Sequence, residues 1–311
     1  MSATETWVSA AEFRAIFTEV STWGRWGADD ERAALHNLTA ERVAAAAQLV
    51  RDGTVVTLSQ PLRTEARVDS PEPADHHMTM LANEDIGLGA VHFAKDYVGL
   101  DYHNPGHSHI DALCHVAFEG SIYNGKPSDS ITADGASFGS IEVLKDGLVG
   151  RGVLLDVPRL RDVSWLEPGD HVFSEDLEAA ERAQGVRVDA GDILLVRTGH
   201  APRLAELGPW DTDAARAGLH PTAVRFLADR GVAALGSDGN NDTAPSTTEG
   251  VAFPIHVLAL NSMGVHLLDY LQFEDLVERC KAEGRWEFLF VAAPLRIVGG
   301  TGSPLNPIAV L

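Results

Sequence analysis

The sequence lacks a long apolar run, and only two of its 311 residues are cysteines. No apolar run approaches the roughly 18 residues that a membrane-spanning helix needs. The segment from Met1 to Ala11 lacks the basic-then-apolar layout of a secretory signal. Cys114 and Cys280 are too few for a disulfide framework, which fits a reducing compartment. We therefore expect a cytoplasmic protein that has no membrane partner.

Positive charge is also scarce. The chain has 24 Lys and Arg against 45 Asp and Glu, a formal net charge of −21. Binding to phosphates requires clustered Lys and Arg, so we expect no nucleic-acid partner. The sequence contains neither a Gly-x-Ser-x-Gly nucleophile motif nor a phosphate-binding loop. What remains is a globular chain whose expected partner is a small-molecule substrate.

Helical and strand patterns alternate through most of the sequence, which predicts a mixed α/β fold. Thr39 is a suitable N-cap for a helix that Gly53 ends. Residues 64–90 are rich in Pro, Asp, Glu and Gly and predict a long loop or flap. No linker divides the chain, so we expect one domain over residues 1–311, with 1–20 as an N-terminal extension. The other predicted helices are 174–185 and 222–229, and the predicted strands are 54–58, 152–157, 192–197, 232–236, 286–293 and 308–311.

Histidines gather in one part of the chain: of the 13, seven lie between His76 and His115. On an extended strand alternate residues face one side, so His107, His109 and Asp111 are expected to converge. Imidazole and carboxylate groups are ligands that Zn, Mn and Fe prefer. His115 lies six residues beyond His109, close enough to bind the same ion or to act as a general base. The spacing therefore predicts a transition-metal site.

The same segment resembles the cyclase family of metal hydrolases, whose motif reads His-x-Gly-Thr-His-x-Asp-x-Pro-x-His. The second half of that motif matches as His109-x-Asp111-x-Leu113-x-His115, with Ser108 where Thr is usual. The resemblance extends from about residue 20 to residue 300. Its other segments are 26–31, 58–62, 150–156 and 191–199.

Two departures from the motif affect the ligand assignment. Pro105 occupies the place of the first motif histidine, and Leu113 replaces the motif proline. Either His103 or His107 could supply the missing ligand, because both lie an even number of residues before His109 and would face the same side of an extended strand. We favour His107 because it is nearer.

In its C-terminal half the family has a further His and an acid about a dozen residues apart. His256 matches the first, and Asp269 stands where the family has Glu. The resemblance implies that His107, His109 and Asp111 bind one metal, Zn or Mn. His256 and Asp269 would complete a second metal position or orient the first, so one or two ions per chain are expected. His115 would move the proton as the general base.

The resemblance further implies a swivelling β/β/α domain that forms a homodimer or homotetramer. The implied activity is hydrolysis of an amide bond, in a cyclic amide or an N-formyl amide, by a metal-activated water. The loops over roughly residues 64–100 and 200–220 are expected to select the substrate. Two other functions stay open: a ferrous oxygenase with a two-His-one-carboxylate site, and a non-catalytic metal-binding protein.

Overall fold

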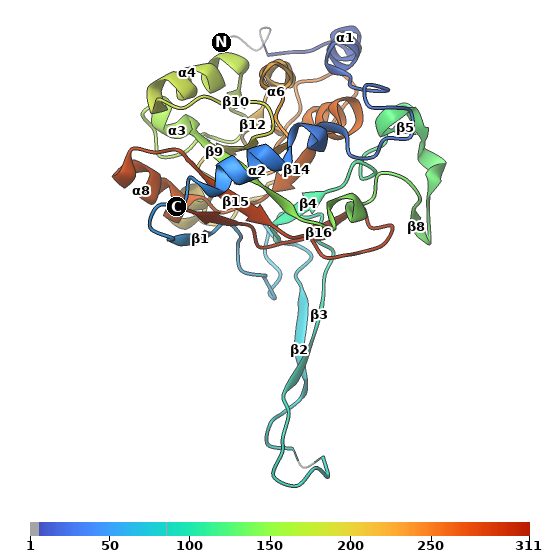
Figure 1. Cartoon of the computed structure of the whole chain (residues 1–311), viewed down its shortest axis with the longest axis vertical. Coiled ribbons are helices and arrows are strands. Elements are labelled where there is room, and N and C mark those ends of the chain that lie inside the picture. Colours follow the sequence, from blue (N-terminus) through green and yellow to red (C-terminus); the bar gives the residue numbers. More distant parts are fainter. Residues whose placement is uncertain (1–5, 85) are drawn as a thin grey trace.

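A computed structural model describes residues 6–84 and 86–311 of the chain. Within this described part, a curled mixed sheet of nine strands forms the body, and helices flank it (Figure 1). The strands follow one another across the sheet in the order β1-β17-β15-β9-β11-β13-β14-β4-β16. Their bounds are β1 Val55–Thr57, β4 His109–Asp111, β9 Leu148–Asp156, β11 Ile193–Arg197, β13 Ala234–Ser237, β14 His266–Asp269, β15 Glu287–Ala292, β16 Gly302–Pro304 and β17 Ile308–Val310.

The centre of the sheet is parallel and its two sides are antiparallel. Strands β9, β11, β13 and β14 run parallel to one another, whereas β15 and β17 on one side and β4 and β16 on the other run antiparallel to their neighbours. All five residues of β11 are buried, as expected for a parallel strand that is covered on both faces. The mixed α/β class predicted from the sequence is therefore confirmed.

Two apolar clusters lie on opposite faces of the sheet, because successive residues of a strand point to opposite sides. On β11, Leu194 and Val196 join one cluster, and Ile193 and Leu195 join the other. The first cluster includes buried side chains of α1, α4 and α6, and the second includes those of α8. The helices are α1 Ala10–Val20, α2 Ala40–Ala47, α3 Val157–Leu160, α4 Ser174–Gln184, α5 His200–Leu207, α6 Val224–Arg230, α7 Pro254–His256 and α8 Glu274–Glu283.

Shorter elements complete the body. Single 3₁₀ turns occur at Ala33–Asn37, Tyr123–Gly125, Ser128–Ser130, Ile141–Leu144 and Pro221–Ala223, and a π-helical segment, Val257–Met263, continues α7. In the described part of the chain, four strand pairs lie outside the main sheet. One forms the hairpin described below, and the other three are β5 Ser121–Ile122 with β6 Lys126–Pro127, β7 Ile131–Thr132 with β8 Gly135–Ala136, and β10 His171–Val172 with β12 Gly218–Leu219.

The predicted elements lie close to the observed ones where the sequence signal is strong. Thr39 accepts a hydrogen bond from the backbone N–H of Arg42 and so begins α2, but this helix ends at Ala47, well before Gly53. Gly185 ends α4 in the left-handed conformation, as predicted. Within residues 1–20, α1 buries Phe13 and Ile16 against the body, while Met1 to Glu5 fall outside the described residues. No described helix has the length and apolarity to cross a membrane.

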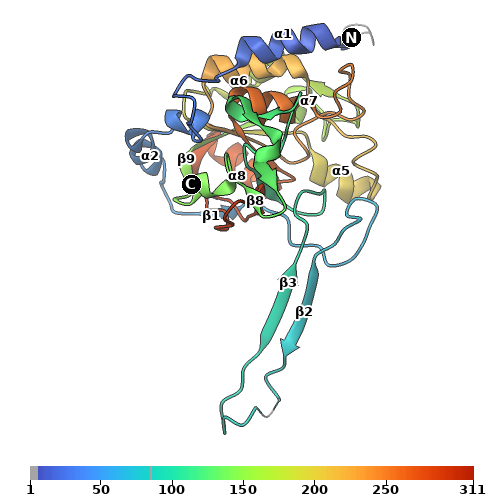
Figure 2. The same ribbon diagram turned by 90° about the vertical axis from the view of Figure 1, so that its right-hand side faces the viewer.

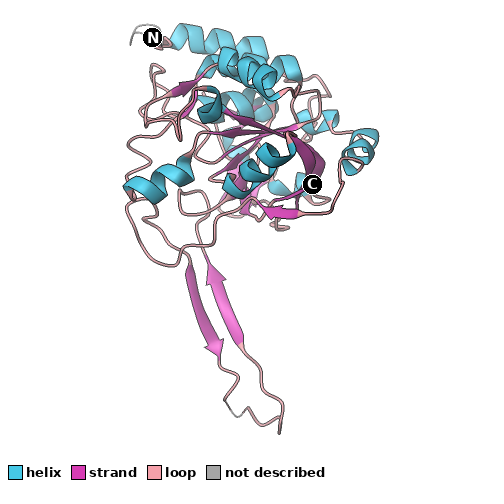
Figure 3. Ribbon diagram, turned by 90° about the vertical axis from the view of Figure 1, so that its left-hand side faces the viewer, coloured by secondary structure: helices cyan, strands magenta, loops and turns pink. Residues whose placement is uncertain are grey.

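Most of the described residues in 64–90 are loop or turn, as predicted, but one strand interrupts them. They contain β2 (Asp75–Met80), which pairs antiparallel with β3 (Lys95–Gly99) in a hairpin that projects far from the body (Figures 1 and 2). The strand was missed because its sequence, Asp-His-His-Met-Thr-Met, is polar and lacks the apolar alternation of a half-buried strand. Figure 3 shows this hairpin standing apart from the helices and the main sheet.

Candidate functional site

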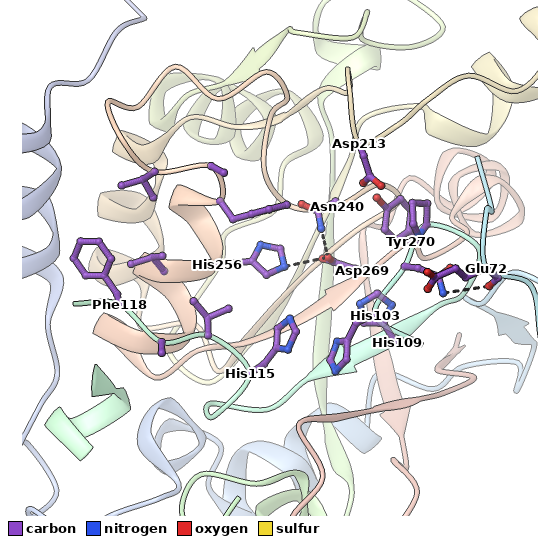
Figure 4. Close-up of a pocket in the computed structure, with 18 of the residues that line it drawn as sticks. Glu72, His103, His109, His115, Phe118, Asp213, Asn240, His256, Asp269 and Tyr270 are labelled. Atoms are coloured by element: carbon purple, nitrogen blue, oxygen red, sulfur yellow. Dashed lines mark hydrogen bonds and ion pairs between the residues drawn. The ribbon is translucent and has the colours of Figure 1, made fainter. Parts of the chain in front are cut away.

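The register between β4 and β14 places the central residues of the site. In this antiparallel pair His109 lies opposite Asp269, and Asp111 lies opposite Leu267. Directly opposed residues share one face of the sheet, so His109 and Asp269 project together into a pocket (Figure 4). His256, the last residue of α7, points to the same place from above the sheet.

The Asp111 carboxylate links two groups of possible ligands. Its Oδ1 lies 2.9 Å from His103 Nδ1 and 3.5 Å from His109 Nε2, and its Oδ2 lies 3.3 Å from His256 Nε2. The same His256 nitrogen is 3.3 Å from Asp269 Oδ2. Among the described residues, His103, His109 and Asp111 form one group with metal-ligating geometry, and Asp111, His256 and Asp269 form the other.

Each of the three imidazoles is anchored through its second nitrogen. His109 Nδ1 donates to the His107 carbonyl at 2.9 Å, and His103 Nε2 lies 3.0 Å from Thr301 Oγ1. His256 Nδ1 lies 2.5 Å from the Asp242 carboxylate. A hydrogen bond at one ring nitrogen fixes the tautomer and leaves the other nitrogen as a metal ligand. All three free nitrogens face Asp111 or Asp269.

The carboxylates are also held in place. Asp269 accepts hydrogen bonds from the side chains of Asn240, at 2.7 Å, and Asn241, at 2.5 Å. Asp242 accepts from the backbone N–H groups of Ile255 and His256 at the start of α7, in addition to its contact with the His256 ring. The residues that follow β13 therefore support much of the His–Asp cluster, which consists of His103, His109, Asp111, His256 and Asp269.

The donor set fits a cation. Asp111, Asp242 and Asp269 are fully buried, and within the described part of the chain no Lys or Arg forms an ion pair with them. The Asp111 oxygens lie close to the imidazole nitrogens of His103 and His256, but none of these contacts has the geometry of a hydrogen bond. Buried charge of this kind is costly unless it is paired or binds a metal. Nitrogen and carboxylate donors at these spacings are the ligands of Zn and Mn.

The pKa shifts reflect the same concentration of charge. Burial by itself would raise the pKa of Asp111, but the surrounding imidazoles, His115 and His103 first among them, hold that pKa well below its usual range. Burial opposes the charged form of His256, yet the adjacent carboxylates of Asp269, Asp111 and Asp242 raise its pKa well above the ordinary value. The pocket floor thus favours positive charge on whatever binds there.

The structure does not bring His107 to this cluster. Strand β4 begins only at His109, and a turn around Asn104, where the His107 N–H donates to the Asn104 carbonyl, precedes it. The alternation of side chains along β4 therefore does not continue back to His107. The His107 ring is buried away from both ligand groups. His103, the less favoured alternative, occupies the position expected for His107.

His115 lines the pocket beside the cluster without belonging to either ligand group. Its ring stacks on that of His103, with ring centroids 3.9 Å apart, and its centroid lies 6.3 Å from that of His256 (Figure 4). Burial lowers the pKa of His115 to about 4, so its imidazole is neutral at physiological pH. A neutral ring in this place can accept a proton.

The pocket has a volume of about 530 Å³ and opens to solvent. Phe118, Val116, Val251 and Phe253 form an apolar wall, and the cluster forms the floor. Of the two loops expected to select substrate, residues 64–100 contribute Pro71 and Glu72, and residues 200–220 contribute Asp213. Much of the second loop is instead helix α5.

Sequence reasoning missed the residues that support the ligands. Asp242 and Asn240 lie in the polar run Gly236–Asp242 after a short apolar strand, a pattern as typical of a plain turn as of a site loop. Thr301 is 198 residues away from the His103 that it contacts, and no local pattern links them. Asp238, from the same run, accepts hydrogen bonds from the backbone N–H groups of Thr198 and Gly199 and stabilises the start of α5.

Comparison with known proteins points to one family. A family model described as putative cyclase matches residues 56–241. A crystal structure described as a novel cyclase is 31% identical, with a TM-score of 0.85 and coverage of 95% of this chain and 99% of the other. No curated protein matches the sequence.

Two further structures share the fold at lower identity. Isatin hydrolase A from Ralstonia solanacearum is 22% identical, with a TM-score of 0.61 and coverage of 87% and 97% of the two chains. A protein from Bacillus stearothermophilus described as a predicted metal-dependent hydrolase is 18% identical, with a TM-score of 0.53 and coverage of 83% and 98%. The curled mixed sheet with its flanking helices therefore matches the fold of these neighbours.

Proposed function

The chain belongs to the cyclase family, and from that membership and its buried cluster we propose that it is a metal-dependent hydrolase that cleaves an amide bond in a small molecule. The observation that carries the proposal is Asp111, a fully buried carboxylate whose two oxygens face imidazoles on both sides, His103 and His256, and no Lys or Arg among the described residues. Similarity to isatin hydrolases and to a metal-dependent hydrolase supports the reaction class. The amide, either cyclic or N-formyl, is the bond that the motif resemblance implies.

We assign His103, His109, Asp111, His256 and Asp269 as the metal ligands. The ion is Zn or Mn, since both accept this mixture of nitrogen and oxygen donors. The two groups that share Asp111 offer room for one ion or two. When bound, such an ion lowers the pKa of a water molecule toward neutrality and polarises a carbonyl oxygen.

The protein's own residues orient the substrate and move the proton. His115 is neutral at physiological pH and lies on the pocket wall, so its ring can take the proton from the attacking water and deliver it to the leaving nitrogen. The apolar wall around Phe118 and Val251 packs against the substrate and excludes water from one side. Asn240 keeps the Asp269 carboxylate turned toward His256.

Two structural features weigh against the alternatives raised by the sequence. A sealed, non-catalytic metal site would have no opening, whereas His103, His109, His256 and Asp269 all line a pocket that opens to solvent. A ferrous oxygenase site uses two histidines and one carboxylate and leaves other positions open. His103, His109 and Asp111 alone match that set, but His256 and Asp269 extend it through the shared Asp111 carboxylate to three histidines and two carboxylates.

The metal assignment is tested by elemental analysis of protein purified without chelator, with a matched pair of variants. We expect one to two equivalents of Zn or Mn per chain. His103→Ala should lose at least about tenfold in metal affinity, because it removes a ligand. His107→Ala should keep its metal, because that ring lies outside both groups. Loss of metal from His107→Ala with retention in His103→Ala would overturn the assignment.

The reaction class is tested separately with the metal-loaded enzyme. N-formyl anilides and cyclic amides should be hydrolysed, and His115→Asn should lose most of the turnover while it keeps its metal. Oxygen consumption that requires ferrous ion would instead indicate an oxygenase. A fully loaded protein that turns over neither amide class would reject amide hydrolysis without affecting the ligand assignment.

A further inference from the structure

A second cavity, of about 490 Å³, lies beside the candidate site and shares no lining residue with it. Its walls come from within the segment 60–67, which leads toward the hairpin, and from one side of α5 (Figure 2). Tyr270 adjoins both cavities: it lines the candidate site, and its ring lies edge-on to that of His200, with the ring centroids 6.0 Å apart. The second cavity therefore neighbours the candidate site across Tyr270.

Two arginines give the second cavity a positive charge. Both face the buried Asp69 carboxylate: Arg67 binds it closely, with Nε 3.0 Å from Oδ1, whereas Arg63 Nη1 remains 3.7 Å from Oδ2. In the described part of the chain, neither arginine pairs with another carboxylate. Arg63 uses one of its N–H donors in a hydrogen bond to Gln60 Oε1. Two guanidinium groups against one carboxylate leave a net positive charge, and Arg63 keeps donors that can bind an anion.

His200 places an unpartnered imidazole on the wall of the same cavity. This residue is only 9% exposed, and the rings of Trp210 and Tyr270 pack against it. Among the described residues, no group forms a hydrogen bond with either nitrogen of the His200 ring. Burial lowers the pKa of His200 to about 4, so the ring is neutral at physiological pH and carries one N–H. Buried polar atoms normally have a partner, so this N–H is available to a ligand.

The rest of the lining is mostly apolar. Pro61 and Leu62 form one side, and Leu204 with two alanines of α5 forms the other. A planar guanidinium matches a carboxylate through two parallel hydrogen bonds. An inorganic anion gains nothing from an apolar wall, whereas a carbon skeleton is stabilised by burial against it. The lining therefore fits a ligand that has a carboxylate at one end and an apolar body at the other.

We propose that the second cavity binds an organic carboxylate with an apolar body. The Arg63 guanidinium and the His200 N–H hold the carboxylate, and the apolar wall packs against the carbon skeleton. The loop residues that line the candidate site, Glu72 and Asp213, are by contrast acids, so positive charge distinguishes the second cavity from it. The proposal does not depend on which bond the candidate site cleaves.

Isothermal titration calorimetry of the full chain with benzoate tests this site. We expect one benzoate per chain to bind there with a dissociation constant of about 1 mM or lower. Nitrobenzene has the same shape without the charge, and inorganic phosphate has charge without the apolar body; each should bind at least about tenfold more weakly. Because a carboxylate can also bind a metal ion, the titration is made on metal-loaded protein and again after metal removal with a chelator. The same benzoate site should be present in both.

Three variants locate the site. Arg63→Gln should weaken benzoate binding at least about tenfold, because it removes the charge that binds the carboxylate. His200→Phe keeps an aromatic ring but has no N–H, and should weaken binding at least about fivefold. Arg225→Gln is the matched control: Arg225 pairs with one carboxylate, that of Glu19 at 2.9 Å, and lines no part of the second cavity. This variant should bind benzoate like the wild type.

The proposal is overturned if the wild type binds no benzoate up to about 10 mM, or if nitrobenzene or phosphate binds as tightly as benzoate. Wild-type affinity in Arg63→Gln, or an equal loss in Arg225→Gln, would also overturn it. Loss of the site on metal removal would place the acid on the metal ion instead. If the thermal midpoint of Arg63→Gln shows that this variant does not fold, His200→Phe decides in its place.

Discussion

At the scale of single residues, the orientation of the His103, His109 and His256 rings depends on a neighbour that hydrogen-bonds to one ring nitrogen. His256 depends on Asp242, which binds its Nδ1 and also accepts the backbone N–H groups at the start of α7. The Asp242 carboxylate thus fixes both the start of α7 and the tautomer of the His256 ring. The His109 ring is held in the same way by the backbone carbonyl of His107, so a substitution of the His107 side chain does not remove that hydrogen bond.

Asp242→Asn should weaken metal binding about 10–100-fold while leaving the ligands in place, because the neutral amide is a poorer acceptor for the His256 ring N–H. The measurement is a competition titration against a metal chelator of known affinity. Asn240→Ala, which removes one hydrogen bond to Asp269, is a useful comparison and should weaken binding less. Equal metal affinity of Asp242→Asn and the wild type would rule out this role for Asp242.

The sequence anticipated part of this cluster. The motif match indicated His109 and Asp111, and the resemblance indicated His256 and Asp269; the structure brings these four together. The choice between His103 and His107 depended on assuming that the strand extended back from His109, and the turn at Asn104 ends it. Asp242 and Thr301 act through contacts far apart in sequence, which spacing alone does not reveal.

At the scale of elements, strands were predictable where both faces are buried, because such strands have a continuous apolar sequence. Strands β11 and β15 lie within one or two residues of their predicted bounds, because their apolar runs end at charged or small residues. Strand β9 starts four residues earlier than predicted, at Leu148, since alternating residues there are only half-buried. The β2–β3 hairpin was not predicted, because a hairpin exposed to solvent on both faces needs no apolar alternation.

One close approach between β9 and β15 depends on a missing side chain. Gly152 lies opposite Phe288, whose ring occupies the space where a Cβ at position 152 would be. Gly152→Ala should therefore lower the free energy of unfolding by about 1–3 kcal/mol through overpacking. Urea denaturation measures this change. Adding Phe288→Leu should recover part of the loss relative to the two single variants; strictly additive losses would show that the ring and the new methyl group do not meet.

At the scale of the whole molecule, buried neutral histidines make the fold sensitive to acid. His171 is nearly buried beside His220, and burial, with the His220 ring, lowers its pKa to about 4. Burial also lowers the pKa of His200 to about 4. In the unfolded chain these rings titrate near 6.5, so the unfolded state binds more protons between these values. Stability must then fall as the pH drops from about 6.5 toward 4.

His171→Gln isolates one of these contributions. For a single histidine with these two pKa values, lowering the pH from 7 to 5 costs about 2 kcal/mol of folding free energy. The variant should therefore lose about 2 kcal/mol less than the wild type over that interval, as measured by urea unfolding at both pH values. A variant with the same pH dependence as the wild type would mean that folding does not lower the pKa of His171.

The residues that form the candidate site are also far apart in the order of synthesis. His103, His109 and Asp111 lie in the first half of the chain, whereas His256, Asp269 and Thr301 lie in the last fifth. Strand β4 enters the sheet between β14 and β16, both of which emerge from the ribosome long after it. The nascent chain therefore holds only half of the site until its C-terminal strands are released, and under the proposed assignment metal binding would be one of the last events of folding.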